Sequence, residues 1–186
     1  SFQYAKYSSR YDKFKEGIIE NAFNPEFSNG ALMDIGVYCV HPLVRLFGMP
    51  KKIIADSLLL SNGVEGAGTI LASYDGMQAE LLYSKITNNR LPSQIQGEDG
   101  TLVIDNITNI CSVVFHDRKG NAETVIDLPP EHSLDGEVKD WLRMIESGEG
   151  VREDNECSLM ELRVMDEARR QAGIVFPADL RKITGC

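Results

Sequence analysis

The stretch from residue 53 to residue 128 constrains the fold most, because strand-like segments alternate there with residues that favour tight turns. Short runs rich in β-branched and aromatic residues, bounded by Gly, Asn and Asp, are typical of β-strands. The pair Asp75-Gly76 predicts a two-residue hairpin with positive φ at both turn positions. Strands are expected at residues 53–60, 69–74, 77–85, 94–96, 101–105, 111–116 and 123–128.

A helix is predicted immediately before this β-region, over residues 31–47. Apolar residues recur there at helical spacing and form one continuous stripe, which is typical of a helix packed on a core. The stripe consists of Leu32, Ile35, Cys39, Leu43, Leu46 and Phe47. Asn29 or Gly30 is expected to cap the start of the helix, and Gly48 with Pro50 is expected to end it.

The remaining segments complete the expected topology. A strand is predicted at residues 2–8, and residues 9–30 lack periodicity and are expected to form a long loop. Two helices are predicted after the β-region, the second beginning near residues 154–155. One helix, a run of strands and two closing helices predict an α+β fold: an open, mostly antiparallel mixed β-sheet with helices packed on one face.

Composition restricts the function classes. The 186 residues suffice for one domain, residues 1–186, and the net charge of −9 argues against nucleic acid and anionic membranes as partners. No apolar run is long enough to span a membrane.

The cysteines and histidines indicate neither a metal site nor an oxidising compartment. The four cysteines are scattered and the chain has three histidines, so no metal site is predicted, and a cytoplasmic location is expected. Because the chain lacks an initiator Met and opens in a strand-like segment, we expect it to be part of a longer protein.

The second face of the predicted helix at residues 31–47 is a candidate site. Asp34, Tyr38, His41 and Arg45 lie at i, i+4, i+7 and i+11, on one stripe opposite the apolar one. A tyrosine hydroxyl, an imidazole and a carboxylate are groups that transfer protons. The alternative is an ordinary solvated face, with the acid offsetting the helix dipole.

Other candidates have weaker support in the sequence. Arg10 and Lys13 are candidate substrate contacts from the loop at residues 9–30, although the sequence alone favours ordinary solvated charge for each. The glycine-rich run GVEGAG at residues 63–68 lies between two strands, so it is interpreted as a turn and strand start, because a dinucleotide-binding loop must open a helix. Cys39 lies on the apolar stripe and is expected to be a buried thiol.

Two sequence motifs resemble those of the Gfo/Idh/MocA family of oxidoreductases. The stretch NGALMDIGVYCVHPLVRLFGMPKKI is similar to the helix that opens the second domain in that family, with matches at Gly30, Leu32, Asp34, Gly36, Tyr38, Leu46 and Gly48. The segment QIQGEDGTLVID at residues 94–105 resembles the family's strand–turn–strand. The resemblance extends over nearly the whole chain.

This resemblance implies a C-terminal substrate-binding and oligomerisation domain, similar to that of glyceraldehyde-3-phosphate dehydrogenase, and an N-terminal Rossmann domain that the chain lacks. That domain would bind NAD or NADP. Tyr38 matches the position of the family's proton donor or acceptor, and Asp34 matches the acid that positions substrate or the proton relay. Some relatives carry a catalytic histidine in this helix, so His41 is included as a candidate. The cofactor-binding residues are unknown.

We therefore expect the substrate-binding half of an NAD(P)-dependent oxidoreductase acting on a small-molecule sugar, polyol or related carbonyl compound. The fragment is expected to be inactive alone. The alternative is a non-catalytic ligand-sensing or assembly module of the same family. Alternating apolar side chains in the strands at residues 69–85 and 111–128 predict a homodimer or tetramer formed through the open sheet face.

Overall fold

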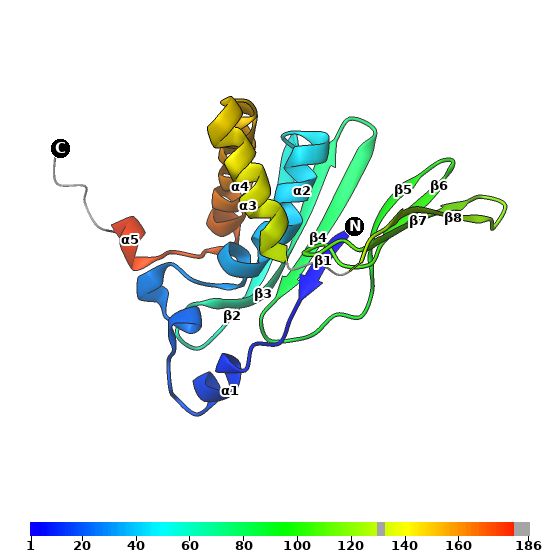
Figure 1. Ribbon diagram of the computed structural model, residues 1–186. Coiled ribbons are helices and arrows are strands. Elements are labelled where there is room, and N and C mark those ends of the chain that lie inside the picture. The colour runs from blue at the N-terminus through cyan, green and yellow to red at the C-terminus, as the bar shows by residue number, and fades with distance from the viewer. Residues whose placement is uncertain (130–132, 181–186) are drawn as a thin grey trace.

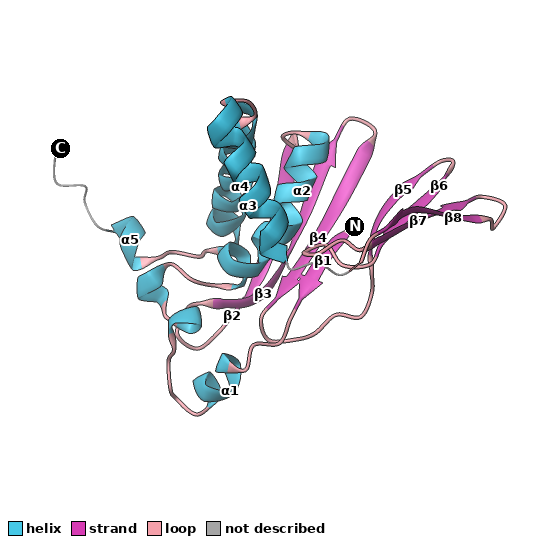
Figure 2. Cartoon of the chain, in the orientation of Figure 1, coloured by secondary structure: helices cyan, strands magenta, loops and turns pink. Residues whose placement is uncertain are grey.

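The β-region folds into two sheets that lie side by side, and helices cover one of them (Figures 1 and 2). The computed structural model describes residues 1–129 and 133–180. Within these residues the strands are mostly antiparallel and the helices form a separate layer, so the predicted α+β class is confirmed.

The first sheet has the strand order β1-β4-β3-β2. Its only parallel contact among the described residues joins β1 to β4, with Phe2 opposite Leu81, which makes the sheet mixed as predicted. The strands are β1 (Phe2–Ala5), β2 (Lys52–Leu59), β3 (Glu65–Tyr74) and β4 (Met77–Ser84).

The second sheet is an antiparallel meander of four strands in chain order. It adjoins the first sheet at the edge strand β1, because the Gln94 amide donates to the Ser1 carbonyl oxygen at 2.8 Å and the Ser1 amino group donates to the Gln94 carbonyl oxygen at 2.8 Å. The strands are β5 (Ser93–Gly97), β6 (Gly100–Ile104), β7 (Ser112–Asp117) and β8 (Ala122–Asp127).

The hairpin between β3 and β4 has the predicted length and a different turn. Tyr74 faces Met77, so two residues connect the strands. Gly76 adopts a φ of +71°, whereas Asp75 is not among the described residues with positive φ, so the prediction of positive φ at both positions was wrong. The left-handed conformation falls on the residue without a Cβ, where it carries no steric cost.

The main core lies between the first sheet and two helices, α2 (Val37–Phe47) and α4 (Val151–Ala172). Both helices contact this sheet and each other, on the same face (Figure 1). Burial of large apolar side chains from both layers supplies the main stabilising free energy. Fully buried members include Leu32, Val40, Leu43, Ile70, Leu81, Tyr83 and Met165.

Three details of the helices differ from expectation. Leu46, assigned to the apolar stripe, is 58% exposed near the end of α2. Helix α4 begins at Val151, earlier than predicted. Helix α3 (Ser133–Ser147) forms as predicted, but its large apolar side chains are exposed rather than packed on a sheet: Leu134, Val138, Trp141, Leu142 and Ile145.

The segment at residues 9–30 contains short helices, so the prediction of an unstructured loop was wrong. It forms α1 (Arg10–Lys15) and two 3₁₀ turns, at Asn21–Phe23 and Pro25–Phe27. Helix α1 has no side-chain cap, and aromatic contacts fix it: the ring centroids of Tyr11 and Phe14 lie 5.7 Å and 5.6 Å from that of Phe23. Such tertiary contacts leave no periodic signal in the sequence. The last described element is α5 (Pro177–Leu180).

Candidate functional site

The candidate helix begins with a π-helical segment, η3 (Leu32–Gly36), which leads directly into α2. A π-turn hydrogen-bonds from i to i+5 and therefore places one extra residue in a turn, a feature that is frequent at functional sites. The helix predicted over residues 31–47 is confirmed. The predicted polar stripe assumed α-helical geometry throughout, and the π-helical segment changes the angle between Asp34 and Tyr38 around the helix axis.

A carboxylate from the first sheet holds the start of this helix. The Leu32 amide donates to Glu65 Oε1 at 2.9 Å, and Glu65 is fully buried at the beginning of β3. The expected capping by Asn29 or Gly30 was wrong: a Cβ on Gly30 would lie 2.1 Å from Glu65 Oε1, so Gly30 is the residue that makes room for the cap. Burial raises the pKa of Glu65, and its Oε2 has no hydrogen-bond partner among the described residues.

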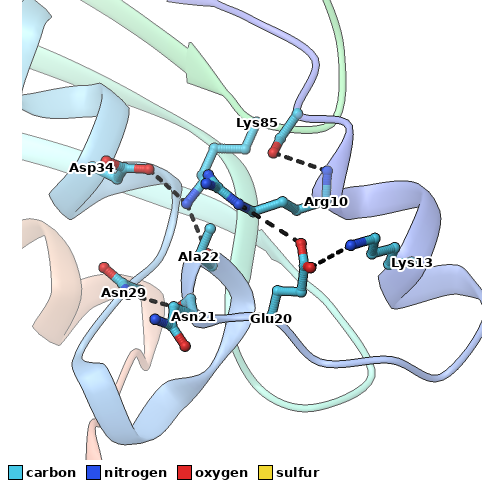
Figure 3. A network of polar contacts seen from close by, with 9 residues as sticks. Arg10, Lys13, Glu20, Asn21, Ala22, Asn29, Asp34 and Lys85 are labelled. Carbon is cyan, nitrogen blue, oxygen red and sulfur yellow. Dashed lines mark hydrogen bonds and ion pairs between the residues drawn. The ribbon is translucent and has the colours of Figure 1, made fainter.

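Asp34 pairs with a buried lysine from the end of β4 (Figure 3). Lys85 Nζ lies 2.7 Å from Asp34 Oδ2 and also donates to the Ala22 carbonyl oxygen at 2.7 Å. The side chain of Lys85 is 2% exposed, whereas that of Asp34 is 51% exposed. The ammonium also lies 5.0 Å from the centroid of the buried Phe23 ring. One oxygen of Asp34 is thus held from the protein interior while the residue faces solvent.

Tyr38 is in the first turn of α2 and is 46% exposed. Its ring contacts Tyr4 of β1 edge to face, with the ring centroids 5.4 Å apart and the planes at 78°. This contact fixes the ring, since aromatic pairs favour such geometry. The Tyr38 hydroxyl has no hydrogen-bond partner among the described residues and is therefore available to a ligand.

His41 and Arg45 contact α4 instead of joining Asp34. His41 Nδ1 lies 2.8 Å from Glu161 Oε2, and Arg45 Nη1 donates to Asp154 Oδ1 at 2.8 Å. The hydrogen bond from Glu161 raises the pKa of His41, because a nearby carboxylate favours the imidazolium. His41 remains half exposed, one turn beyond Tyr38.

Arg10 and Lys13, the two predicted substrate contacts, lie on α1 and share one acidic partner. Arg10 Nε is 3.7 Å from Glu20 Oε2, and Lys13 Nζ is 2.5 Å from Glu20 Oε1 (Figure 3). Both cations are mostly exposed. Glu20 directly precedes the turn that carries Ala22, so α1 and the Lys85–Asp34 pair meet at the same short segment.

Sequence reasoning missed Lys85 and Glu65, although one signal for Lys85 was present. Residues two apart in a strand face the same side of a sheet, so Lys85 continues the face of Leu81 and Tyr83, which are both fully buried. A lysine on that face indicates a buried charge that needs a partner. No comparable signal identified Glu65, because its role depends on the approach of the helix at residue 32.

The glycine-rich run at residues 63–68 does not form a phosphate-binding loop. As predicted, it is a turn and strand start, with β3 beginning at Glu65. Its glycines serve packing: a Cβ on Gly68 would lie 2.3 Å from Tyr83 Oη, and one on Gly66 would lie 3.0 Å from Ile86. Residues 63–68 therefore offer no cradle for a dinucleotide. The described part of the chain contains no group of three or more His, Cys, Asp or Glu placed to hold a metal ion.

Cys39 is fully buried on the helix face that packs on the sheet, as predicted. Burial raises the pKa of its thiol to about 12, so it stays protonated and is no nucleophile at neutral pH. Within residues 1–129 and 133–180, no helix combines the length and the apolar character that crossing a bilayer requires.

Solved structures of similar fold include two oxidoreductases, and this chain matches about half the length of each. A 3-ketoreductase from Actinomadura kijaniata, solved with TDP-benzene and NADP, matches 91% of this chain with a TM-score of 0.70 and 20% identity, and the match covers 51% of that chain. A UDP-N-acetylglucosamine 3-dehydrogenase from Acidithiobacillus ferrooxidans matches 96% of this chain with a TM-score of 0.66 and 18% identity, covering 53% of that chain. The fold is therefore the α+β domain found in enzymes of this class.

The sequence profile described as the GFO/IDH/MocA C-terminal domain matches residues 5–103. The chain belongs to the GFO/IDH/MocA family, which confirms the resemblance derived from the helix motif. Asp34, Tyr38, Glu65 and Lys85 all lie within the matched residues.

Two relatives match almost the full length of this chain. The chain is 47% identical to a scyllo-inositol 2-dehydrogenase (NADP(+)) of Bacillus subtilis over 95% of its length, and 35% identical to an uncharacterized oxidoreductase of Escherichia coli over 98%. These matches cover 54% and 56% of the two relatives, so the chain spans about half the length of the curated relatives it matches.

Proposed function

We propose that this chain is the substrate-binding half of an NADP-dependent dehydrogenase that acts on a cyclic polyol or a sugar. The 47% identity to a scyllo-inositol 2-dehydrogenase (NADP(+)) carries the proposal, together with the coverage of 95% of this chain. The geometry is compatible with it, because Asp34 and the free Tyr38 hydroxyl lie on one exposed helix start. A separate domain of the full-length protein would bind the dinucleotide, since residues 63–68 offer no cradle.

The proposed chemistry assigns proton handling to this chain. Oxidation of a secondary alcohol removes a hydride from carbon and a proton from oxygen, and a bound dinucleotide supplies the hydride acceptor. Tyr38 in its phenolate form would take the proton from the substrate hydroxyl and become the phenol, and the phenol would return that proton in the reverse direction. Asp34 would accept a hydrogen bond from that hydroxyl or a neighbouring one. His41 stays a candidate one turn away, held by Glu161. Arg10 and Lys13 stay predicted substrate contacts that would have to exchange Glu20 for substrate oxygens.

The test uses the full-length protein with NADP⁺ and NAD⁺ against a panel of inositols and sugars. Replacing Tyr38 by Phe removes only the hydroxyl and should lower kcat/KM by about 10²- to 10⁴-fold, the usual contribution of a general acid or base. Tyr74→Phe is the matched control, because the Tyr74 hydroxyl donates to the Gly48 carbonyl oxygen at 2.9 Å and lies outside the site. Turnover that survives Tyr38→Phe would contradict the assignment. Ligand binding without turnover would favour the sensing or assembly module.

The open face of the first sheet supports a second part of the proposal, homo-oligomer formation. Strands β2 and β3 alternate buried and exposed apolar residues: Ile53 and Ile70 are buried, while Ile54 and Leu71 are 57% and 50% exposed on the opposite face. Exposed apolar surface of this kind is typical of a protein–protein contact. A symmetric dimer would cover it. Sedimentation that finds a monomer at tens of micromolar would contradict this part.

A further inference from the structure

We propose that Lys85 is a positioning residue that fixes the orientation of the Asp34 carboxylate toward substrate. This inference rests on the proposed function and adds to it a buried residue from a different strand end. It concerns the contact between Lys85 Nζ and Asp34 Oδ2 at 2.7 Å (Figure 3).

The burial of the two partners differs sharply. Lys85 is 2% exposed and Asp34 is 51% exposed, so the lysine approaches the carboxylate from the protein interior. A surface ion pair is weak because water competes for both ions and both side chains lose entropy. Here only one partner is solvated, and the buried ammonium cannot leave its place. The carboxylate is therefore tethered by an immobile cation.

The tether leaves one carboxylate oxygen available. Asp34 Oδ2 is paired with Lys85, and Asp34 Oδ1 has no partner among the described residues. A carboxylate with one oxygen fixed presents the other in a defined direction, which suits it to accept a hydrogen bond from a substrate hydroxyl. The backbone supports this direction, because the Asp34 amide donates to the Gly30 carbonyl oxygen at 3.1 Å.

The lysine is itself held on several sides. Its ammonium donates to the Ala22 carbonyl oxygen at 2.7 Å and lies 5.0 Å from the centroid of the Phe23 ring, a cation–π contact. The Asn62 side chain donates to the Phe23 carbonyl oxygen at 2.7 Å, which anchors the turn at residues 21–23 to the connection between β2 and β3. Lys85 is therefore fixed before any substrate arrives.

A purely structural role is the competing explanation. Lys85 could serve only to hold the turn at Ala22, and its loss would then lower activity by loosening the fold. The two explanations predict different losses of activity when Lys85 and Asp34 are changed together. A residue that acts through Asp34 has nothing left to do once Asp34 is changed, whereas a structural role persists.

The experiment is a double-mutant cycle in the full-length enzyme, with Lys85→Met, Asp34→Asn and the double variant. Lys85→Met should lower kcat/KM by about 10²-fold, the size expected when a reacting group is misplaced. The double variant should match Asp34→Asn within about threefold. Lys51→Met is the control, since Lys51 pairs with Asp75 at 2.5 Å on the exposed surface, and it should retain activity.

Three outcomes would overturn the inference. Activity unchanged in Lys85→Met, with Asp34→Asn impaired, removes the role of Lys85 and leaves the proposed function standing. If the fold-loss of kcat/KM in the double variant equals the product of the two single losses, Lys85 has a structural role only. Unchanged activity in both Asp34→Asn and Tyr38→Phe instead refutes the proposed site itself. If Lys85→Met does not fold, Lys85→Gln replaces it in the same cycle, because its amide can still donate to Ala22.

Discussion

Replacing Gly30 by alanine should destabilise the protein strongly although the change adds one methyl group. A Cβ at this position would lie 2.1 Å from Glu65 Oε1, 2.2 Å from Oε2 and 2.3 Å from Cδ, well inside van der Waals contact. Glu65 is fully buried and has little space into which it can retreat. The carboxylate or the backbone at residue 30 must move, and the hydrogen bond that holds the Leu32 amide at 2.9 Å is lost or distorted.

The magnitude follows from two contributions. A hydrogen bond to a charged group contributes about 1.5–3 kcal/mol, and forcing an extra methyl group into a packed site costs about 1–3 kcal/mol. The two overlap, because one movement of Glu65 relieves the clash and breaks the bond. We therefore expect a loss of about 2–4 kcal/mol, which for a domain of this size lowers Tm by about 4–16 °C.

The assay is thermal unfolding followed by circular dichroism. Gly136→Ala is the matched control, because no atom lies within 4 Å of the position that the added methyl group would take and the residue is inside helix α3, where alanine is the better helix former. The double variant Gly30→Ala/Glu65→Ala should lose less than the sum of its parts, since removing the carboxylate removes the clash. A Tm for Gly30→Ala within about 1 °C of wild type, or fully additive losses, would refute the reasoning.

Two further predictions concern pH. Burial raises the pKa of Glu65 above its ordinary value of 4.5, so the stability that the protonated acid contributes is present below pH 4.5 and is lost as pH rises through the folded-state pKa. Glu65→Gln lacks this titration. Urea unfolding between about pH 4.5 and 8 should therefore show the free energy of unfolding of the variant rising relative to that of wild type as pH rises. A difference in unfolding free energy that stays constant with pH would contradict this prediction. Glu161 raises the pKa of His41 above 6.5, so the stabilising pair is complete below pH 6.5 and weakens as pH rises through the folded-state pKa. His41→Gln should therefore be less stable than wild type by under about 1 kcal/mol near pH 6 and equal to it near pH 9, and a gap that widens with pH would exclude this explanation.

The fold was largely predictable because it depends on local periodicity. Alternating residues indicated the strands, and the apolar stripe from Leu32 to Phe47 indicated the helix that packs on them. The segment at residues 9–30 was not predictable, since Tyr11 and Phe14 fold back onto Phe23 through contacts that have no repeating pattern. The two-sheet division was hidden for the same reason: the junction at Ser1 and Gln94 joins residues far apart in the chain.

The candidate site was also predictable only in part. The sequence by itself determined that Asp34 and Tyr38 lie near the start of one helix and that the chain resembles a family in which this helix carries catalytic groups. Only the tertiary structure decided that Asp34 lies in a π-helical segment that ends before Tyr38, that Glu65 caps the helix and that Lys85 holds Asp34 from the protein interior. The physical reason is that helical periodicity depends on neighbours along the chain, whereas a buried charge is stable only where distant segments bring it a partner.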